Sequence, residues 1–233
     1  MRIPPASLTK IMTMYIAMDM VKAKKLDLKK PVRVSAAAAA TGGSRMRLKR
    51  GQQPTLETLL TGMAVASGND ASMAVAQRIS TSSRRFVTLM NQKAKSLGMR
   101  NSVFKTPHGL PAQGQITTAR DMLTLSLSYL RVHPQARRFH KTAVMRYNGF
   151  TMRNTNGLLG TVAGVDGLKT GWTAASGYNL IFTAIRGKTR LLGVVMGGSS
   201  KIGRDTAARR LLEAGFQFPR DPRKVARRID RRR

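Results

Sequence analysis

The chain has 233 residues, a length that favours one sizeable domain or two small ones and suffices to bury a core. Its 42 Lys and Arg residues against 10 Asp and Glu give a formal net charge of +32, which points first to an anionic partner, while 42% hydrophobic residues exclude a disordered basic chain. The absence of cysteine excludes a disulfide framework, thiolate metal sites and a cysteine nucleophile, and only three histidines remain for a histidine-based site.

The N-terminal part of the chain shows mainly helical periodicity. Apolar residues at helical spacing over residues 8–21, after Pro4 and Pro5, predict a helix surrounded by protein, because polar residues interrupt the run and it is too short to span a membrane. A short strand is expected near residues 32–34. Further helices are predicted with N-caps at Thr55, Asp70, Ser83 and Thr118.

The hydrophobic pattern changes in the C-terminal part. Short strands are predicted over residues 164–170, 178–185 and 190–196, the last two joined as a hairpin, followed by a helix over about 203–214. A helical cluster packed on an antiparallel sheet is an α+β arrangement, and this is the predicted fold class. We expect one domain over residues 1–219 and a basic tail over residues 220–233.

Three short motifs occur in order along the chain. Ser7-Leu8-Thr9-Lys10 begins the buried helix, Ser67-Gly68-Asn69 lies between two helices, and Lys169-Thr170-Gly171 lies on a strand beside the hairpin. Each motif alone is weak. A second Ser-x-x-Lys, at residues 102–105, runs directly into Thr106-Pro107, where a helix does not begin comfortably. The order and context of the three motifs together are typical of β-lactamases and penicillin-binding proteins.

The residue types in these motifs suit catalysis by an activated serine. Ser7 and Lys10 are three residues apart on a helix, so the amine can approach the hydroxyl and remove its proton. A lysine acts as a base only when its pKa is lowered, which burial and a second cation such as Lys169 would achieve. Ser67 is suited to relay a proton to the leaving amine, and Asn69 to hold the substrate amide or orient Lys10.

Longer segments around these motifs resemble the serine-type D-alanyl-D-alanine carboxypeptidases, the low-molecular-mass penicillin-binding proteins. The resemblance extends over nearly the whole chain, from about residue 4 to residue 219. The segments that carry it are residues 5–13, 66–72, 104–110, 118–122, 156–159 and 165–171.

The resemblance implies a reaction and its substrate contacts. Ser7 would attack the bond between the two terminal D-alanines of a peptidoglycan stem peptide, water would hydrolyse the acyl-enzyme, and β-lactams would acylate the same serine. The backbone N–H groups of Ser7 and Trp172 would form the oxyanion hole. Thr170 and Gly171 would line the substrate strand, since a glycine lets a backbone approach closely. Arg204 would hold the terminal carboxylate with its planar fork.

The resemblance also implies a location and a departure from the family. We expect a periplasmic or otherwise extracytoplasmic enzyme without cofactor or metal, although residues 1–5 do not read as an export signal. The family has sheet strands before its serine segment. We therefore expect the sheet to lack these N-terminal strands and to expose an edge. Thr155 stands where some members have an arginine, so substrate contacts are expected to differ there.

Rival functions follow from the same features. A class A β-lactamase needs a glutamate for its deacylating water, and neither Glu57 nor Glu213 lies between Ser67 and Lys169, which argues against that class. An endopeptidase that cuts D,D-crosslinks with the same residues stays open.

A non-enzymatic rival is a truncated, inactive relative that binds the cell wall or another polyanion. Nucleic acid is not expected as a partner, because aromatic residues make up 5% of the chain and no nucleic-acid module is recognisable. The diffuse positive charge instead favours an anionic cell wall or membrane surface. His108 is expected to be a structural loop residue, and His133 and His140 surface residues.

Overall fold

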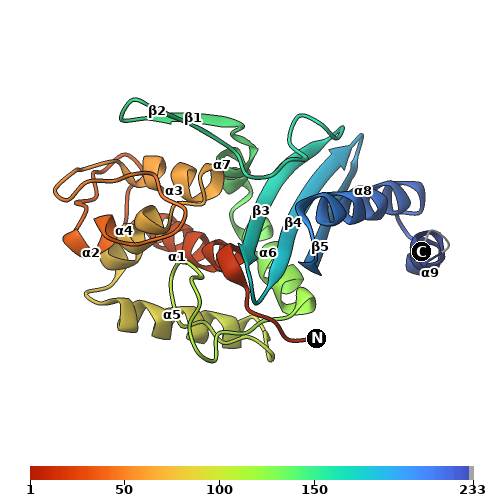
Figure 1. The fold of residues 1–233 in the computed structure, drawn as a ribbon, viewed down its shortest axis with the longest axis horizontal. Helices are drawn as coiled ribbons and strands as arrows, with labels where there is room; N and C mark the ends of the chain where they lie inside the picture. The colour runs from red at the N-terminus through yellow and green to blue at the C-terminus, as the bar shows by residue number, and fades with distance from the viewer. Residues whose placement is uncertain (231–233) are drawn as a thin grey trace.

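The computed structural model describes residues 1–230, in which a helical body packs against a three-stranded antiparallel sheet (Figure 1). This arrangement confirms the predicted α+β fold. The helical body consists of η1 (Ala6–Thr9), α1 (Lys10–Lys22), α2 (Ala36–Ala39), α3 (Leu56–Val65), α4 (Asn69–Ile79), α5 (Ser83–Ser96), α6 (Ala119–Val132), η2 (Pro134–Ala136) and α7 (Arg137–Lys141). The remaining elements are β1 (Val144–Tyr147), β2 (Phe150–Arg153), β3 (Val165–Thr173), β4 (Gly177–Arg186), β5 (Thr189–Gly198), α8 (Lys201–Gln217) and α9 (Pro222–Asp230).

Helix α1 occupies the middle of the helical body. Residues on every side of it are buried, including Met12, Met14 and Tyr15, so it needs no polar face. Helices α3, α4, α5 and α6 all contact it, and η1, which precedes it directly, packs on β3. The start of α1 therefore lies where the helical body meets the sheet (Figure 1).

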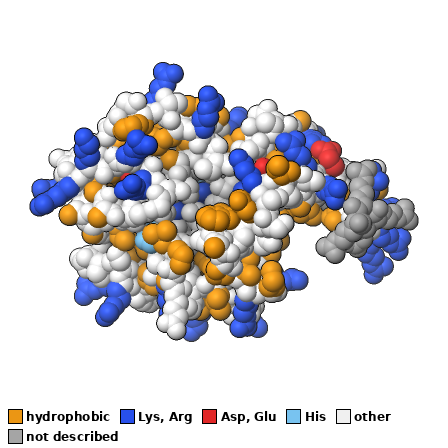
Figure 2. Space-filling view, in the orientation of Figure 1, with side chains coloured by type: hydrophobic (Ala, Val, Ile, Leu, Met, Phe, Trp, Pro, Cys, Tyr) orange, Lys and Arg blue, Asp and Glu red, His pale blue; other side chains and the backbone are white. Residues whose placement is uncertain are grey.

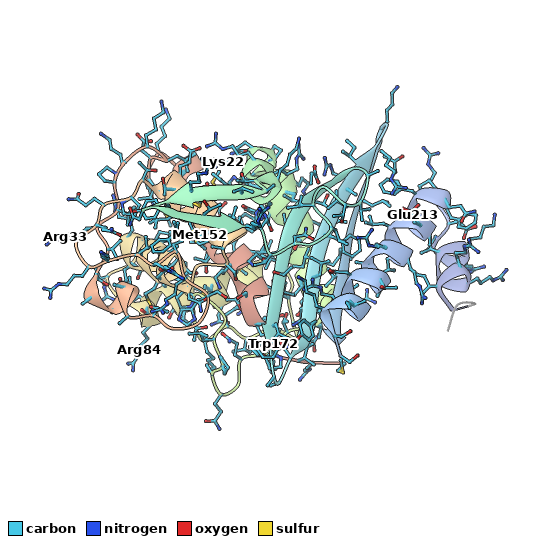
Figure 3. All side chains as sticks on the ribbon, turned by 45° about the horizontal axis from the view of Figure 1, so that its top comes forward. Lys22, Arg33, Arg84, Met152, Trp172 and Glu213 are labelled. Atoms are coloured by element: carbon cyan, nitrogen blue, oxygen red, sulfur yellow. The ribbon has the colours of Figure 1, made fainter. Side chains whose placement is uncertain are left out.

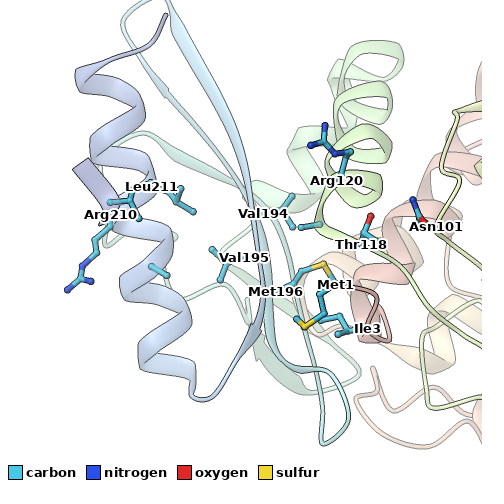
Figure 4. Close-up of a pocket in the computed structure, with 13 residues that line it drawn as sticks. Met1, Ile3, Asn101, Thr118, Arg120, Val194, Val195, Met196, Arg210 and Leu211 are labelled. Atoms are coloured by element: carbon cyan, nitrogen blue, oxygen red, sulfur yellow. The ribbon is translucent and has the colours of Figure 1, made fainter. Parts of the chain in front are cut away.

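The sheet has the order β3-β4-β5 and is antiparallel throughout. Its β3 edge faces η1 and α7, and α8 packs on β4 and β5. Among residues 1–230, β5 pairs only with β4, so it is an edge strand as expected. A cavity of about 660 Å³ lies beside it, between α8 and the beginning of α6, and is lined by Val194, Val195 and Met196 (Figure 4). None of the described helices is long and apolar enough to cross a membrane.

The structure differs from the strands predicted from the sequence in two short segments. Residues 32–34 form no strand, although backbone hydrogen bonds tie them to the segment 51–54: the Val32 N–H bonds to Pro54 O, the Val34 N–H bonds to Gln52 O, and Val34 O accepts from the Gly51 N–H. The hairpin β1–β2 was not predicted. Its turn is Asn148-Gly149, with φ of 49° and 77°, and Asn-Gly between alternating residues is a signal that could have revealed it.

The helix caps agree with the sequence in two of four places. Thr55 and Thr118 cap α3 and α6 with their side-chain oxygens. Helix α5 is capped by Ser82, one residue before the predicted Ser83. Asp70 is not a cap but the second residue of α4. Its buried carboxylate instead accepts hydrogen bonds from two backbone N–H groups of the preceding loop, those of Met46 and Leu48.

The expectation that His133 and His140 lie on the surface is wrong, since both are fully buried. His133 Nε2 lies 2.7 Å from Asp19 Oδ1, and the His140 ring lies between α6 and β3, within hydrogen-bonding distance of both. The sequence carries no signal of this burial, because a polar side chain close to basic residues such as Arg131 and Lys141 looks the same whether it is exposed or bonded inside. His108, by contrast, is the structural loop residue that was predicted: its Nδ1 accepts from the Leu110 N–H at 3.2 Å.

Candidate active site

Ser7 and Lys10 face each other at the start of the central helix. Ser7 lies in the short helix η1, and Lys10 is the first residue of α1. Lys10 Nζ is 3.0 Å from Ser7 Oγ, which is hydrogen-bonding distance. Lys10 is fully buried, whereas Ser7 is partly exposed and so can be reached from solvent.

The surroundings of the Lys10 amine favour its neutral form. Nζ donates to Asn69 Oδ1 at 2.6 Å and to His108 O at 2.7 Å. A neutral amine has two N–H bonds and one lone pair, so these two acceptors leave the lone pair for the Ser7 hydroxyl. Burial, and next the positive charge of Lys169, hold the pKa of Lys10 well below its usual range. The pair therefore has the geometry and electrostatics of a nucleophile and its general base.

Lys169 lies on β3 and is 1% exposed. Its Nζ donates to the backbone oxygen of Thr170 at 3.0 Å. Burial, and next the positive charge of Arg204, lower the pKa of Lys169 to about 7. A second buried lysine near Lys10 thus adds to the cost of protonating Lys10.

Ser67 and Asn69 lie at the junction of α3 and α4. Ser67 has φ of 56°, a left-handed conformation that costs a non-glycine residue on the order of 1–3 kcal/mol. Asn69, the first residue of α4, is fixed by its backbone and its amide: its N–H bonds to Ser44 O at 2.7 Å, and Nδ2 donates to Gly42 O at 2.8 Å. This strained junction directs Ser67 into the site and Asn69 Oδ1 onto Lys10.

Gly171 and Trp172 lie near the end of β3, the strand that packs on η1, and Figure 3 labels Trp172. A Cβ on Gly171 would lie 3.0 Å from Ser7 N and 3.1 Å from Leu8 N, so a side chain there would press on the backbone of η1, and glycine lets η1 pack closely on the strand. The Trp172 side chain is 56% exposed and its ring lies 5.8 Å from that of Tyr178.

A pocket of about 300 Å³ opens onto these residues. Six of the nine predicted site residues line it, and Lys10, Asn69 and Lys169 are buried next to Ser7 and Thr170. Arg204 is 4% exposed and donates through Nε and Nη2 to Asp205 Oδ1. The residues that line the pocket are Ser7, Ser44, Ser67, Thr155, Thr170, Gly171, Trp172, Tyr178, Lys201 and Arg204.

Sequence reasoning did not find Ser44, Tyr178 or Lys201. None of them belongs to a motif, and only the folding of separate segments brings them to the pocket. Thr155 was noted from its place before Asn156-Gly157; its Oγ1 lies 2.6 Å from Thr170 Oγ1. The hydroxyl groups of Thr155 and Thr170 thus line the pocket at the position where some family members have an arginine.

A comparison with known proteins identifies the family of the chain. The peptidase S11 family, described as D-alanyl-D-alanine carboxypeptidase, matches residues 1–200. The chain belongs to this family.

Individual members of the D-alanyl-D-alanine carboxypeptidase family are similar over most of the chain. It is 41% identical over 224 residues to the D-alanyl-D-alanine carboxypeptidase DacC of Escherichia coli (strain K12), covering 93% of this chain and 56% of that protein. The chain thus spans about half the length of the curated relatives it matches.

Solved structures of the same family share the fold. The D-alanyl-D-alanine carboxypeptidase DacD from Francisella tularensis superposes with a TM-score of 0.90 at 34% identity, over 91% of this chain and 64% of that one. Penicillin-binding protein D2 from Listeria monocytogenes in its ampicillin-bound form has a TM-score of 0.79 at 30% identity, over 92% of this chain and 88% of that one.

Proposed function

We propose that this chain is a serine D-alanyl-D-alanine carboxypeptidase domain that removes the terminal D-alanine from peptidoglycan stem peptides. The observation that carries the proposal is the 3.0 Å contact between Ser7 Oγ and the buried Lys10 amine, whose pKa is strongly lowered. Family membership adds the substrate class.

In the proposed acylation step, Lys10 takes the Ser7 proton as the oxygen attacks the carbonyl carbon of the penultimate D-alanine. The backbone N–H groups of Ser7 and Trp172 stabilise the oxyanion. Ser67, which lines the pocket, passes a proton to the leaving amine, and the bond to the last D-alanine breaks. Water then hydrolyses the Ser7 ester by the reverse proton path and regenerates the hydroxyl.

The terminal carboxylate is proposed to bind between Arg204 and Thr170. Both residues line the pocket, and the pair formed by Arg204 and Asp205 fixes the guanidinium. Asn69 holds Lys10 in place through its amide oxygen, and Lys169 disfavours the protonated form of Lys10.

Covalent labelling with a fluorescent penicillin tests this proposal, since β-lactams are expected to acylate the same serine. We expect wild-type protein to be labelled and Ser7→Ala not to be. Ser102→Ala is a matched control, because Ser102 belongs to the other Ser-x-x-Lys and its Oγ bonds to Asp121, away from the pocket. A folded wild type that takes no label, and releases no D-alanine from an acyl-D-Ala-D-Ala peptide, would favour the inactive-relative reading.

The charge of the chain supports a proposal about a further partner. Lys and Arg side chains are scattered over the face in Figure 2 rather than gathered in one band, and the formal charge is +32. We propose that residues 1–219 form the catalytic domain and that this domain acts outside the cytoplasm. We also propose that this domain and the basic segment 220–233 are attracted to an anionic cell wall or membrane surface. Such binding should weaken steeply with added salt in a wall sedimentation assay. Salt-independent binding would contradict it.

A further inference from the structure

The proposed mechanism leaves one buried titratable side chain unused, that of His140 on α7. Helix α7 packs directly on β3 (Figure 1). The ring is fully buried and both of its nitrogens have partners: Nδ1 lies 3.0 Å from Leu168 O, and Nε2 lies 3.2 Å from the Tyr129 hydroxyl. Leu168 directly precedes Lys169, so the ring bonds to the peptide group that carries that lysine.

The partners determine the tautomer of the ring. A backbone carbonyl can only accept, so His140 Nδ1 carries the proton and donates it to Leu168 O. Nε2 is then an acceptor and receives the Tyr129 hydroxyl proton. Burial lowers the pKa of His140 to about 3 and raises that of Tyr129, so the ring is neutral and the hydroxyl protonated at neutral pH.

The packing around the ring leaves little room for it to move. A Cβ on Gly167 would lie 3.2 Å from His140 Cβ, so α7 touches the strand where that side chain is missing. The titratable groups that face the ring are Tyr129 from α6 and Lys169 from β3. Helix α3 also packs on α7, but its Glu57 carboxylate pairs with Arg138.

We propose that His140 is a positioning residue for Lys169: its Nδ1–H holds the Leu168–Lys169 peptide of β3 in the orientation that presents the Lys169 amine beside Lys10. This inference rests on the proposed function, because it acts on the reaction only through Lys169. It assigns His140 no contact with substrate.

Two substitutions separate the hydrogen bond from the packing. His140→Phe fills the space and removes the donor, while His140→Asn keeps an N–H at the position of Nδ1. We expect His140→Phe to lower the second-order rate constant of acylation by fluorescent penicillin about tenfold, less than the roughly hundredfold that a 1 Å misplacement can cost. We expect His140→Asn to recover most of this loss.

A matched control is His133→Phe, at a second fully buried histidine. Its ring bonds to Asp19 and not to β3, so its loss should reduce stability without slowing acylation by the folded protein. Equal slowing in His133→Phe and His140→Phe would overturn the proposal. So would a folded His140→Phe variant with the wild-type rate.

A second measurement does not depend on turnover. In protein with ¹³C-labelled lysine, the titration midpoint of Lys169, assigned with Lys169→Gln, should move up toward the ordinary lysine value in His140→Phe and stay near the wild-type value in His140→Asn. If wild type takes no penicillin label but the midpoint moves, the proposed function fails and the positioning role stands. An unchanged midpoint refutes the positioning role.

If His140→Phe does not fold, Tyr129→Phe replaces it. This change removes the donor to Nε2, one of the two contacts that orient the ring, and keeps the bond to Leu168 O, so a smaller loss of acylation and a smaller rise of the Lys169 midpoint are expected. Wild-type values of both in Tyr129→Phe would overturn the proposal.

Discussion

The two edges of the sheet differ in how they are packed and in what they can do. At the inner edge, β3 packs on η1 and α7, and both buried lysines donate to oxygens of their own chain. At the outer edge, β5 is mostly half-buried and borders the apolar cavity of about 660 Å³. The smaller pocket of about 300 Å³ holds the candidate site. The candidate site thus lies beside buried, hydrogen-bonded amines whose pKa values are lowered, and not at the larger cavity.

The largest effect is expected from removing the base at the inner edge. Lys10→Met keeps an unbranched side chain, one atom shorter, but cannot accept the Ser7 proton. We expect the rate constant of acylation to fall by about 10²–10⁴-fold, the usual contribution of a general base. Stopped-flow measurement with a fluorescent penicillin checks this, and a fall of less than about tenfold would contradict the role of Lys10.

Two glycine substitutions compare the edges directly. An added Cβ in Gly171→Ala presses on the backbone of Ser7, and in Gly193→Ala it collides with the Phe182 ring. Each change is expected to cost about 1–3 kcal/mol of unfolding free energy, as overpacking does. Only Gly171→Ala should also slow acylation of the folded protein. Denaturant melts measure the loss of stability, and labelling with a fluorescent penicillin measures the rate of acylation. Slow acylation in folded Gly193→Ala would contradict the idea that only the β3 edge affects the reaction.

The pH dependence of stability tests the burial of Lys169. Its folded-state pKa of about 7 lies below the unfolded value of 10.5, so between these values the unfolded chain binds more protons. The free energy of unfolding contributed by this residue therefore rises with pH across that window. We expect Lys169→Met to flatten the rise in urea melts recorded from pH 7 to 10, whereas identical slopes would mean that Lys169 is exposed.

The smallest effect is expected at the outer edge. Val194 is half-buried and lines the cavity beside β5. Val194→Thr should cost no more than about 1 kcal/mol of stability, the typical size of a single-residue effect, and should leave the acylation rate unchanged. A loss of acylation comparable to that of Gly171→Ala would show that the two edges are coupled.

The sequence by itself determined the fold class, the main helices and the three strands of the larger sheet, and the three motifs. It could do so because these features depend on local periodicity and on residue types at fixed spacing, such as Ser7 and Lys10 on one turn. It also pointed to Lys169 as a cation for Lys10, by resemblance and by the chemistry that a neutral lysine requires.

Only the tertiary structure decided which distant groups meet. The bond from Lys10 to His108 O, the passage of η1 over Gly171 and the buried ring of His140 against Leu168 O all join segments far apart in the chain. Local pattern gives no signal for such contacts, because a polar side chain has the same neighbours in sequence whether it faces water or a buried carbonyl. For that reason His133 and His140 looked like surface residues, and folding placed both in the interior.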